Sequence, residues 1–260
     1  MSQITAVTFD LWQTLLLDNR ELGRERAQLR LEGTQEALKR IGENYSIEHL
    51  REAYRACYRH CHRVREDNLD VSFQEQVDIF INFISPDLPD LVNRLPQETI
   101  QKITRTYSDA FFVYPPVPHD ESVAVLEGIK DMGLKIGLIS NTGMTPGTAF
   151  RRFLDQHNLL HYFHTLTFSD EVKLAKPSDQ IFRLTVDSLH TTPEQTVHVG
   201  DHVINDVQGA KQVGMKTIWI EGFYEREDPT DPKTEPDIAV PDLGEVVSAV
   251  EKLRQLAERA

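Results

Sequence analysis

Hydrophobic residues recur along this chain at two different spacings, which divide it into two kinds of region. Residues 4–10, Ile-Thr-Ala-Val-Thr-Phe-Asp, are mostly apolar or β-branched, which predicts a buried strand. Between about residues 20 and 112, apolar positions such as Leu22, Leu29 and Leu38 recur at helical spacing. We expect a first helix there, followed by helices at 47–66, 72–84 and 96–111.

After residue 118, strand-like apolar runs alternate with helical patterns. The stretch Tyr114-Pro-Pro-Val-Pro118 cannot continue a helix, because proline lacks a backbone N–H group and restricts the residue before it. A loop rich in proline and acidic residues is expected at 222–236. Beyond residue 118 we expect helices at 120–132, 146–157, 178–190, 204–213 and from 242, and strands at 135–140, 164–168, 196–200, 216–220 and 237–240.

Helices and strands that alternate in this way predict a parallel sheet with helices on both faces. The fold class is therefore α/β, a doubly wound parallel sheet. Its first strand is separated from the others by the long helical region, which indicates an inserted all-α subdomain. We expect a core domain formed by residues 1–17 and 113–260 and a helical cap domain at 18–112.

Composition and charge narrow the classes of function. Hydrophobic residues make up 40% of the 260 residues, enough for a packed core, and the net charge is −13. Such a charge disfavours nucleic-acid binding, although a small anionic substrate can still bind where a lysine or a metal reverses the local field. No apolar run is long enough for a membrane span, and nothing marks the N-terminus for secretion, so a cytoplasmic protein is expected.

Polar residues gather where the predicted strands end. Ligands bind outside the carboxyl ends of the strands in an open parallel sheet, so these residues are expected to meet in one cleft. In chain order they are Asp10 and Thr14, then Ser140 and Asn141, then Lys176 before Pro177, and finally Gly200, Asp201 and Asp206.

The chemistry of these residue types suits phosphoryl transfer. Asp10, Asp201 and Asp206 offer the hard oxygen ligands that Mg²⁺ prefers, and carboxylates packed so closely need a cation to remain ionised. Lys176 adds a positive charge beside a bound anion, and Ser140 with nearby backbone N–H groups can donate hydrogen bonds to a phosphoryl oxygen. Asp10 can attack phosphorus to form an aspartyl-phosphate.

Four motifs in this order resemble those of the haloacid dehalogenase superfamily, over residues 4–20 and 112–258. They are Asp10-x-Trp12-x-Thr14, Ser140-Asn141, Lys176-Pro177 and Gly200-Asp201-x₄-Asp206. The resemblance implies a Rossmann-like core with a helical cap of the family's first (C1) type, inserted after the first strand.

The same resemblance implies a role for each site residue. Asp10 would be the nucleophile, and Lys176 would hold both the nucleophile and the phosphate. Mg²⁺ would be bound by Asp10, Asp201 and the backbone carbonyl of Trp12, with Asp206 acting through water. Thr14, Ser140, Asn141 and Lys176 would bind the phosphate.

Trp12 departs from the family's phosphatase pattern. Phosphatases of this family carry a second aspartate at that position, which protonates the leaving group and then activates water. Loss of a general acid/base typically removes about 10²–10⁴ in rate. The haloacid dehalogenases proper carry an aromatic residue there, but Ser and Asn in the fourth motif, where this chain keeps Gly200-Asp201.

The phosphonate-cleaving branch also lacks the second aspartate and uses a cap lysine, but Lys39 and Lys102 lie in no recognisable motif. A Mg²⁺-dependent phosphatase acting on a small phosphorylated metabolite is therefore the leading hypothesis. A 2-haloacid dehalogenase and a weakly active or non-catalytic relative are the alternatives. The sequence predicts neither the physiological substrate nor the oligomeric state.

Several other residues have a structural and a functional interpretation. Trp12 is expected to be an apolar plug between core and cap, and Cys57 and Cys61 to lie on the buried face of a cap helix rather than, with His60, in a zinc site. His202 is expected in the cleft, in contact with substrate or with a metal-bound water. Arg20, Arg24, Arg26 and Arg30 are interpreted as a charged outer face paired with Glu21, Glu25 and Glu32, with Arg24 and Arg26 as candidates for contacting a substrate.

Overall fold

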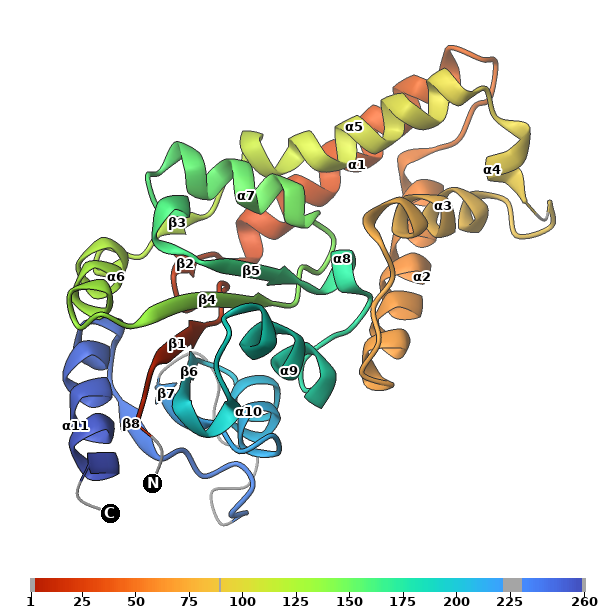
Figure 1. The fold of residues 1–260 in the computed structure, drawn as a ribbon. Helices are drawn as coiled ribbons and strands as arrows, with labels where there is room; N and C mark the ends of the chain where they lie inside the picture. Colours follow the sequence, from red (N-terminus) through yellow and green to blue (C-terminus); the bar gives the residue numbers. More distant parts are fainter. Residues whose placement is uncertain (1–2, 89, 222–230, 259–260) are drawn as a thin grey trace.

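The computed structural model describes residues 3–88, 90–221 and 231–258, and its centre is a parallel sheet (Figure 1). The strand order is β5-β4-β1-β6-β7-β8, so β1 lies between two strands that follow it much later in the chain. The order runs outward from β1 on both sides, which is the doubly wound topology expected. The strands are β1 Ala6–Phe9, β4 Lys135–Ser140, β5 Thr165–Phe168, β6 Thr196–Gly200, β7 Lys216–Ile220 and β8 Ile238–Val240.

Helices cover both faces of the sheet. On one face α6, α7 and α11 contribute residues such as Leu126, Phe150 and Val250 to the largest hydrophobic cluster, while α9 and α10 contribute to a second cluster around Phe182. The helices of the core are α6 Ser122–Asp131, α7 Gly147–Gln156, α8 Ser169–Val172, α9 Asp179–Ser188, α10 Gly209–Lys211 and α11 Val246–Glu258, with 3-10 turns at Leu160–Tyr162, Pro193–Gln195 and Leu243–Glu245.

The structure departs from the expected elements at several places, among them the short helix α4 (Leu91–Arg94) and the two-residue strand β2 (Leu16–Leu17), which were not expected. The helix expected at 204–213 is a π-helix, Val203–Gln208, followed by the short α10. Within the expected connector at 114–118, Val117–Pro118 forms β3, which pairs antiparallel with β2, Leu16–Leu17. The short helix α8 was not expected. The loop expected at 222–236 lies mostly outside the described residues.

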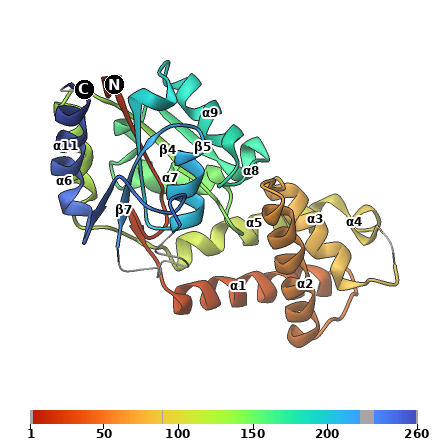
Figure 2. The same ribbon diagram turned by 90° about the horizontal axis from the view of Figure 1, so that it is seen from below.

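The helical insertion lies between β2 and β3 and has a hydrophobic cluster of its own (Figures 1 and 2). Hydroxyl side chains begin two of its helices, because Ser46 Oγ accepts a hydrogen bond from His49 N, and Ser72 forms a capping box with Glu75. Its helices are α1 Arg20–Lys39, α2 Ile47–Glu66, α3 Phe73–Ile84, α4 Leu91–Arg94 and α5 Gln97–Val113.

The insertion contacts the core near the end of α2. Arg65 Nη2 donates to the backbone oxygen of Gly143 at 2.9 Å, and Ser169 Oγ donates to Asp70 Oδ2 at 2.6 Å. An antiparallel bridge joins Leu69 to Leu174. These contacts hold the insertion over the side of the core where β4 and β5 end. Among the described residues, no helix has the length and apolar character needed to cross a bilayer.

Candidate functional site

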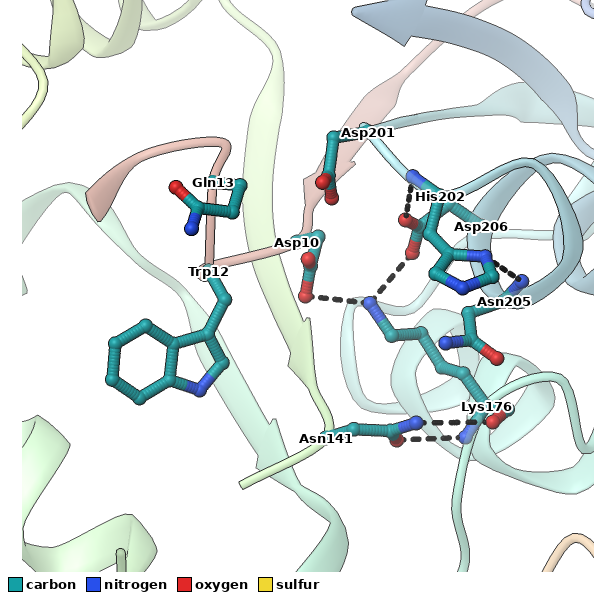
Figure 3. A pocket seen from close by; sticks show the side chains of 9 residues that line it. All are labelled: Asp10, Trp12, Gln13, Asn141, Lys176, Asp201, His202, Asn205 and Asp206. Atoms are coloured by element: carbon teal, nitrogen blue, oxygen red, sulfur yellow. Dashed lines mark hydrogen bonds and ion pairs between the residues drawn. The ribbon is translucent and has the colours of Figure 1, made fainter. Parts of the chain in front are cut away.

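A pocket of about 170 Å³ lies at the carboxyl ends of β1, β4 and β6 (Figure 3). Each of these strands ends in a loop that supplies polar side chains, because adjacent parallel strands end at the same edge of the sheet. The residues that line the pocket are Asp10, Trp12, Gln13, Asn141, Lys176, Asp201, His202, Asn205 and Asp206. The side chains of Thr14 and Ser140, which were expected to bind phosphate, are buried outside this lining.

Lys176 joins two of the carboxylates. Its Nζ lies 2.6 Å from Asp10 Oδ1 and 2.6 Å from Asp206 Oδ1 (Figure 3). Burial favours loss of the lysine proton, but the two carboxylates outweigh this effect and raise the pKa of Lys176. The backbone of Lys176 is held by Asn141, whose Oδ1 accepts from the lysine N–H at 2.8 Å and whose Nδ2 donates to its carbonyl at 3.0 Å.

Asp206 is bonded through both carboxylate oxygens. Besides Lys176, Oδ1 accepts from His198 Nε2 at 3.1 Å, and Oδ2 accepts from the backbone N–H of His202 at 3.0 Å. Burial opposes ionisation of Asp206, but Lys176 and His198 overcome it and hold its pKa well below the usual range. A Cβ on Gly200 would lie 2.3 Å from Asp206 Cγ, so only glycine leaves room for this carboxylate.

His198 was missed in the sequence. It lies in the middle of β6, is fully buried, and has Nδ1 2.8 Å from the Thr8 hydroxyl on the neighbouring strand β1. Burial lowers the pKa of His198. The one available signal was a histidine inside the apolar run Thr-Val-His-Val-Gly, where a buried polar ring needs a partner.

Asp201 has a different environment from Asp206. Its Oδ2 is buried and has no hydrogen-bond partner within the described part of the chain. Burial, followed by the negative charges of Asp10 and Asp206, raises the pKa of Asp201 to about 9, and burial also raises that of Asp10 to about 6. Three carboxylates thus share one lysine, which leaves excess negative charge in a buried place.

This cluster fits a bound divalent cation. One carboxylate oxygen from each of Asp10, Asp201 and Asp206 lies within 4.8 Å of the others. A cation would supply the partner that Asp201 Oδ2 lacks and would balance the excess charge. All the donors are hard oxygen atoms, the ligands that suit Mg²⁺.

Trp12 lies at the boundary between the core and the helical insertion, as expected of an apolar plug. Its half-buried ring makes edge-on contacts with Phe150 of α7, at 5.2 Å between centroids, and with Phe111 of α5, at 6.3 Å. The indole also lines the pocket, on the opposite side of Asp10 from Lys176 (Figure 3). The indole therefore fills the boundary between core and insertion and also forms part of the pocket wall.

The arginines of α1 require a correction. Arg26 and Arg30 are buried and form no pair with Glu21, Glu25 or Glu32, so for these two residues the expected outer face is wrong. Arg26 pairs with Asp18 and donates to the Tyr114 carbonyl at 2.9 Å. These two residues lie in the two chain segments that connect core and insertion, so the guanidinium group of Arg26 is bound to both segments. Arg30 donates to the Tyr107 carbonyl, Tyr54 Oη and Thr145 Oγ1. Arg20 and Arg24 are exposed.

Two further expectations are confirmed. Cys57 and Cys61 are fully buried in the hydrophobic cluster of the insertion. His202 lines the pocket, where its Nδ1 accepts hydrogen bonds from the backbone N–H groups of Ile204 and Asn205 at 3.2 and 3.3 Å. These two bonds begin the π-helix and fix the histidine ring beside Asp206.

The combination of a doubly wound sheet, a helical insertion after its first strand and an aspartate cluster at the strand ends defines a class of capped α/β hydrolases. A family model of haloacid dehalogenase-like hydrolases matches residues 4–214. The chain belongs to the haloacid dehalogenase-like hydrolase family.

Individual relatives carry different names. The chain is 30% identical to a glyceraldehyde 3-phosphate phosphatase of Methanopyrus kandleri over 56% of its length and 62% of the relative's. It is 33% identical to a phosphoserine phosphatase of Thermus thermophilus, over 56% of its own length and 57% of that protein's. The chain therefore spans about three fifths of the length of these two relatives.

A solved structure extends the likeness of fold to nearly the whole chain. The 2-haloacid dehalogenase of Pseudomonas syringae pv. tomato has a TM-score of 0.66 and 22% identity, covering 96% of this chain and 99% of that one. At this identity the likeness shows the fold, including the helical insertion, and leaves the reaction to be argued from the site.

Proposed function

We propose that this protein is a Mg²⁺-dependent phosphatase that acts on a small phosphorylated metabolite through an aspartyl-phosphate at Asp10. One observation carries the proposal: Asp201 is a buried carboxylate whose Oδ2 has no partner among the described residues. It lies beside Asp10, the candidate nucleophile, which Lys176 already contacts. The names of the relatives above support a phosphorylated substrate. A pocket of about 170 Å³ suits a small one, since pockets for drug-sized ligands begin at roughly 300 Å³.

In this proposal, Asp10, Asp201 and the backbone carbonyl of Trp12 would hold Mg²⁺, with Asp206 acting through water. When bound, the ion supplies positive charge that neutralises the phosphate oxygens. Lys176 contacts Asp10 Oδ1, which leaves Asp10 Oδ2 as the oxygen that attacks phosphorus. Lys176 and Asn141 would also bind the phosphate, and so would Thr14 and Ser140, whose buried hydroxyls have no hydrogen-bond partner among the described residues.

The first experiment measures phosphate release from p-nitrophenyl phosphate with Mg²⁺ and with a chelator. We expect activity only with the ion, and a loss of at least about 10³-fold in Asp10→Asn, because the amide cannot act as the nucleophile. Asp179→Asn, a change at an exposed carboxylate, is the matched control and should retain full activity. Activity that survives in Asp10→Asn would exclude this residue as the nucleophile.

Trp12 favours a second candidate, a 2-haloacid dehalogenase in which Asp10 attacks carbon. An aromatic ring there lines the pocket, and a halide leaves without needing a proton. The surplus carboxylate at Asp201 argues against it, because displacement at carbon has no use for a cation. Chloride release from 2-chloropropionate in the presence of a chelator would establish this alternative, and inactivity on both substrates would favour a non-catalytic relative.

A further inference from the structure

The pocket contains several nucleophilic and charged groups but few that can donate a proton to a leaving group. Lys176 is held between two carboxylates that favour its charged form. The side chains of Gln13, Asn141 and Asn205 are amides, which do not transfer protons. In the proposed function Asp10 is the nucleophile and Asp201 is a ligand of the cation, so neither would serve as the acid.

His202 does not replace the missing acid. Its Nδ1 accepts two backbone N–H groups, from Ile204 and Asn205. A protonated ring would carry a hydrogen on Nδ1 as well, and that hydrogen would point at the same two N–H groups. The ring is therefore engaged through Nδ1 as the acceptor that begins the π-helix.

Trp12 stands at the sequence position where, by the resemblance described above, phosphatases of this family carry their acid. The indole is fixed by edge-on contacts with Phe111 and Phe150, and it lines the pocket next to Asp10. Its N–H is far too weak an acid to protonate an alkoxide. Within the described residues, the lining therefore offers a nucleophile and charge stabilisation but no general acid.

We propose that the substrates of this site are phosphoric mixed anhydrides, and acyl phosphates in particular, whose leaving group departs as a stable anion. This inference rests on the proposed function and names its substrate class. An Asp10 oxygen forms a bond to phosphorus, the bond from phosphorus to the leaving oxygen breaks, and the electron pair leaves on a carboxylate. A carboxylic acid has a pKa near 4, so its anion needs no proton at neutral pH, whereas an alkoxide does.

The second half of the reaction involves the same type of leaving group. Water attacks the phosphorus of the aspartyl-phosphate, the bond to the Asp10 oxygen breaks, and the electron pair returns to the Asp10 carboxylate, while the proton of water passes to phosphate or solvent. The aspartyl-phosphate is itself an acyl phosphate. A site suited to cleaving this intermediate without an acid is equally suited to an acyl phosphate substrate.

The test is the dependence of kcat/KM on the leaving group. The probes are acetyl phosphate, a series of aryl phosphates with phenols of different pKa, and glycerol 3-phosphate. We expect acetyl phosphate and the most acidic phenols to be cleaved fastest, and glycerol 3-phosphate to be slower by at least about 10²-fold, the contribution of a general acid. Equal rates on glycerol 3-phosphate and on the activated probes would overturn the inference and leave the proposed function standing.

A matched pair of variants isolates the acid. Trp12→Asp and Trp12→Asn remove the same ring and differ in one ionisable group. Trp12→Asp should gain about 10²-fold on glycerol 3-phosphate relative to Trp12→Asn and flatten the dependence on leaving-group pKa. Equal rates for the two variants would contradict the inference. If neither variant folds, the dependence of the wild-type kcat/KM on leaving-group pKa decides alone. Absence of phosphate release from every probe would reject the proposed function itself.

Discussion

Two buried polar clusters lie at the side of the core that the helical insertion covers, and they differ in how completely their charges are paired. At the contact between insertion and core, both oxygens of Asp70 have partners: Arg65 lies 3.1 Å from Oδ1, and Ser169 Oγ donates to Oδ2. In the pocket, Asp201 Oδ2 has no partner among the described residues. Burial alone does not separate the two aspartates, since both are below 5% exposed.

The difference shows how a structural charge can be told from one reserved for a ligand. A buried carboxylate whose lone pairs are all occupied stabilises the fold, because removing its charge leaves its partners unpaired. A buried carboxylate with an unpaired oxygen and two like charges nearby destabilises the protein until a cation binds. Asp70 and Asp201 should therefore respond in opposite directions to the same isosteric change.

The largest effect on stability is expected for Asp70→Asn. The change leaves Arg65 without its counter-ion and places an amide N–H₂ group against existing donors, which should lower the free energy of unfolding by about 3 kcal/mol. Urea unfolding followed by far-UV circular dichroism measures it. Asp67→Asn, an exposed neighbour, is the control and should change stability by less than about 0.5 kcal/mol. Equal losses of stability in Asp70→Asn and Asp67→Asn would mean that the paired charge of Asp70 does not stabilise the fold.

A smaller effect of opposite sign is expected for Asp201→Asn in the presence of a chelator. The folded protein holds a proton on Asp201 up to a pH of about 9, because burial raises its pKa, whereas the unfolded chain releases it near pH 3.8. Between these values the folded state binds more protons, so the stability of the wild-type protein falls as pH rises. The variant should escape this loss and be more stable at pH 8 by about 2 kcal/mol.

Thermal unfolding at pH 5 and pH 8, with and without Mg²⁺, measures the comparison. Mg²⁺ should stabilise the wild-type protein and have much less effect on Asp201→Asn, because the variant loses a charged ligand. Asp10, whose pKa is raised to about 6, also titrates between these two pH values, so the two proteins are compared at pH 8, where Asp10 is ionised in both. If Asp201→Asn were less stable than the wild-type protein at pH 8 under chelation, the Asp201 carboxylate would stabilise the cation-free protein instead of destabilising it.

Apolar runs and motif positions made much of this architecture predictable. Strands at 135–140, 196–200 and 216–220 have the bounds expected from their hydrophobic runs, because central strands of a parallel sheet are apolar on both faces. The meeting of Asp10 and Asp201 followed from the rule that strand ends meet at one edge of the sheet, whereas Lys176, which lies beyond β5 and α8, was predicted from the order of the motifs.

Features that depend on partners distant in the sequence were not predictable. Arg26 and Arg30 are surrounded in sequence by glutamates, which suggests local pairing, yet their partners come from Asp18, Tyr114 and Thr145. His198 gave no sign of which face of β6 it occupies. The π-helix at 203–208 begins with hydrogen bonds to the His202 side chain, which helix propensity does not describe.

The smallest effect is expected for Arg26→Lys. Like Asp70, Arg26 is a buried charge with a partner of opposite charge. Arg26 uses one guanidinium nitrogen for Asp18 and the other for the carbonyl of Tyr114, so one side chain joins the two connections between core and insertion. A lysine keeps the charge but lacks the two-pronged geometry, and should lose one of the two contacts. We expect unfolding to become easier by about 1 kcal/mol. Arg24→Lys, at an exposed position on the same helix, is the control.

Limited proteolysis near residues 18–20 and 113–116 should be faster in Arg26→Lys alone, because its connections are held less firmly. Equal cleavage of both variants would mean that Arg26 contributes to packing without restraining the insertion.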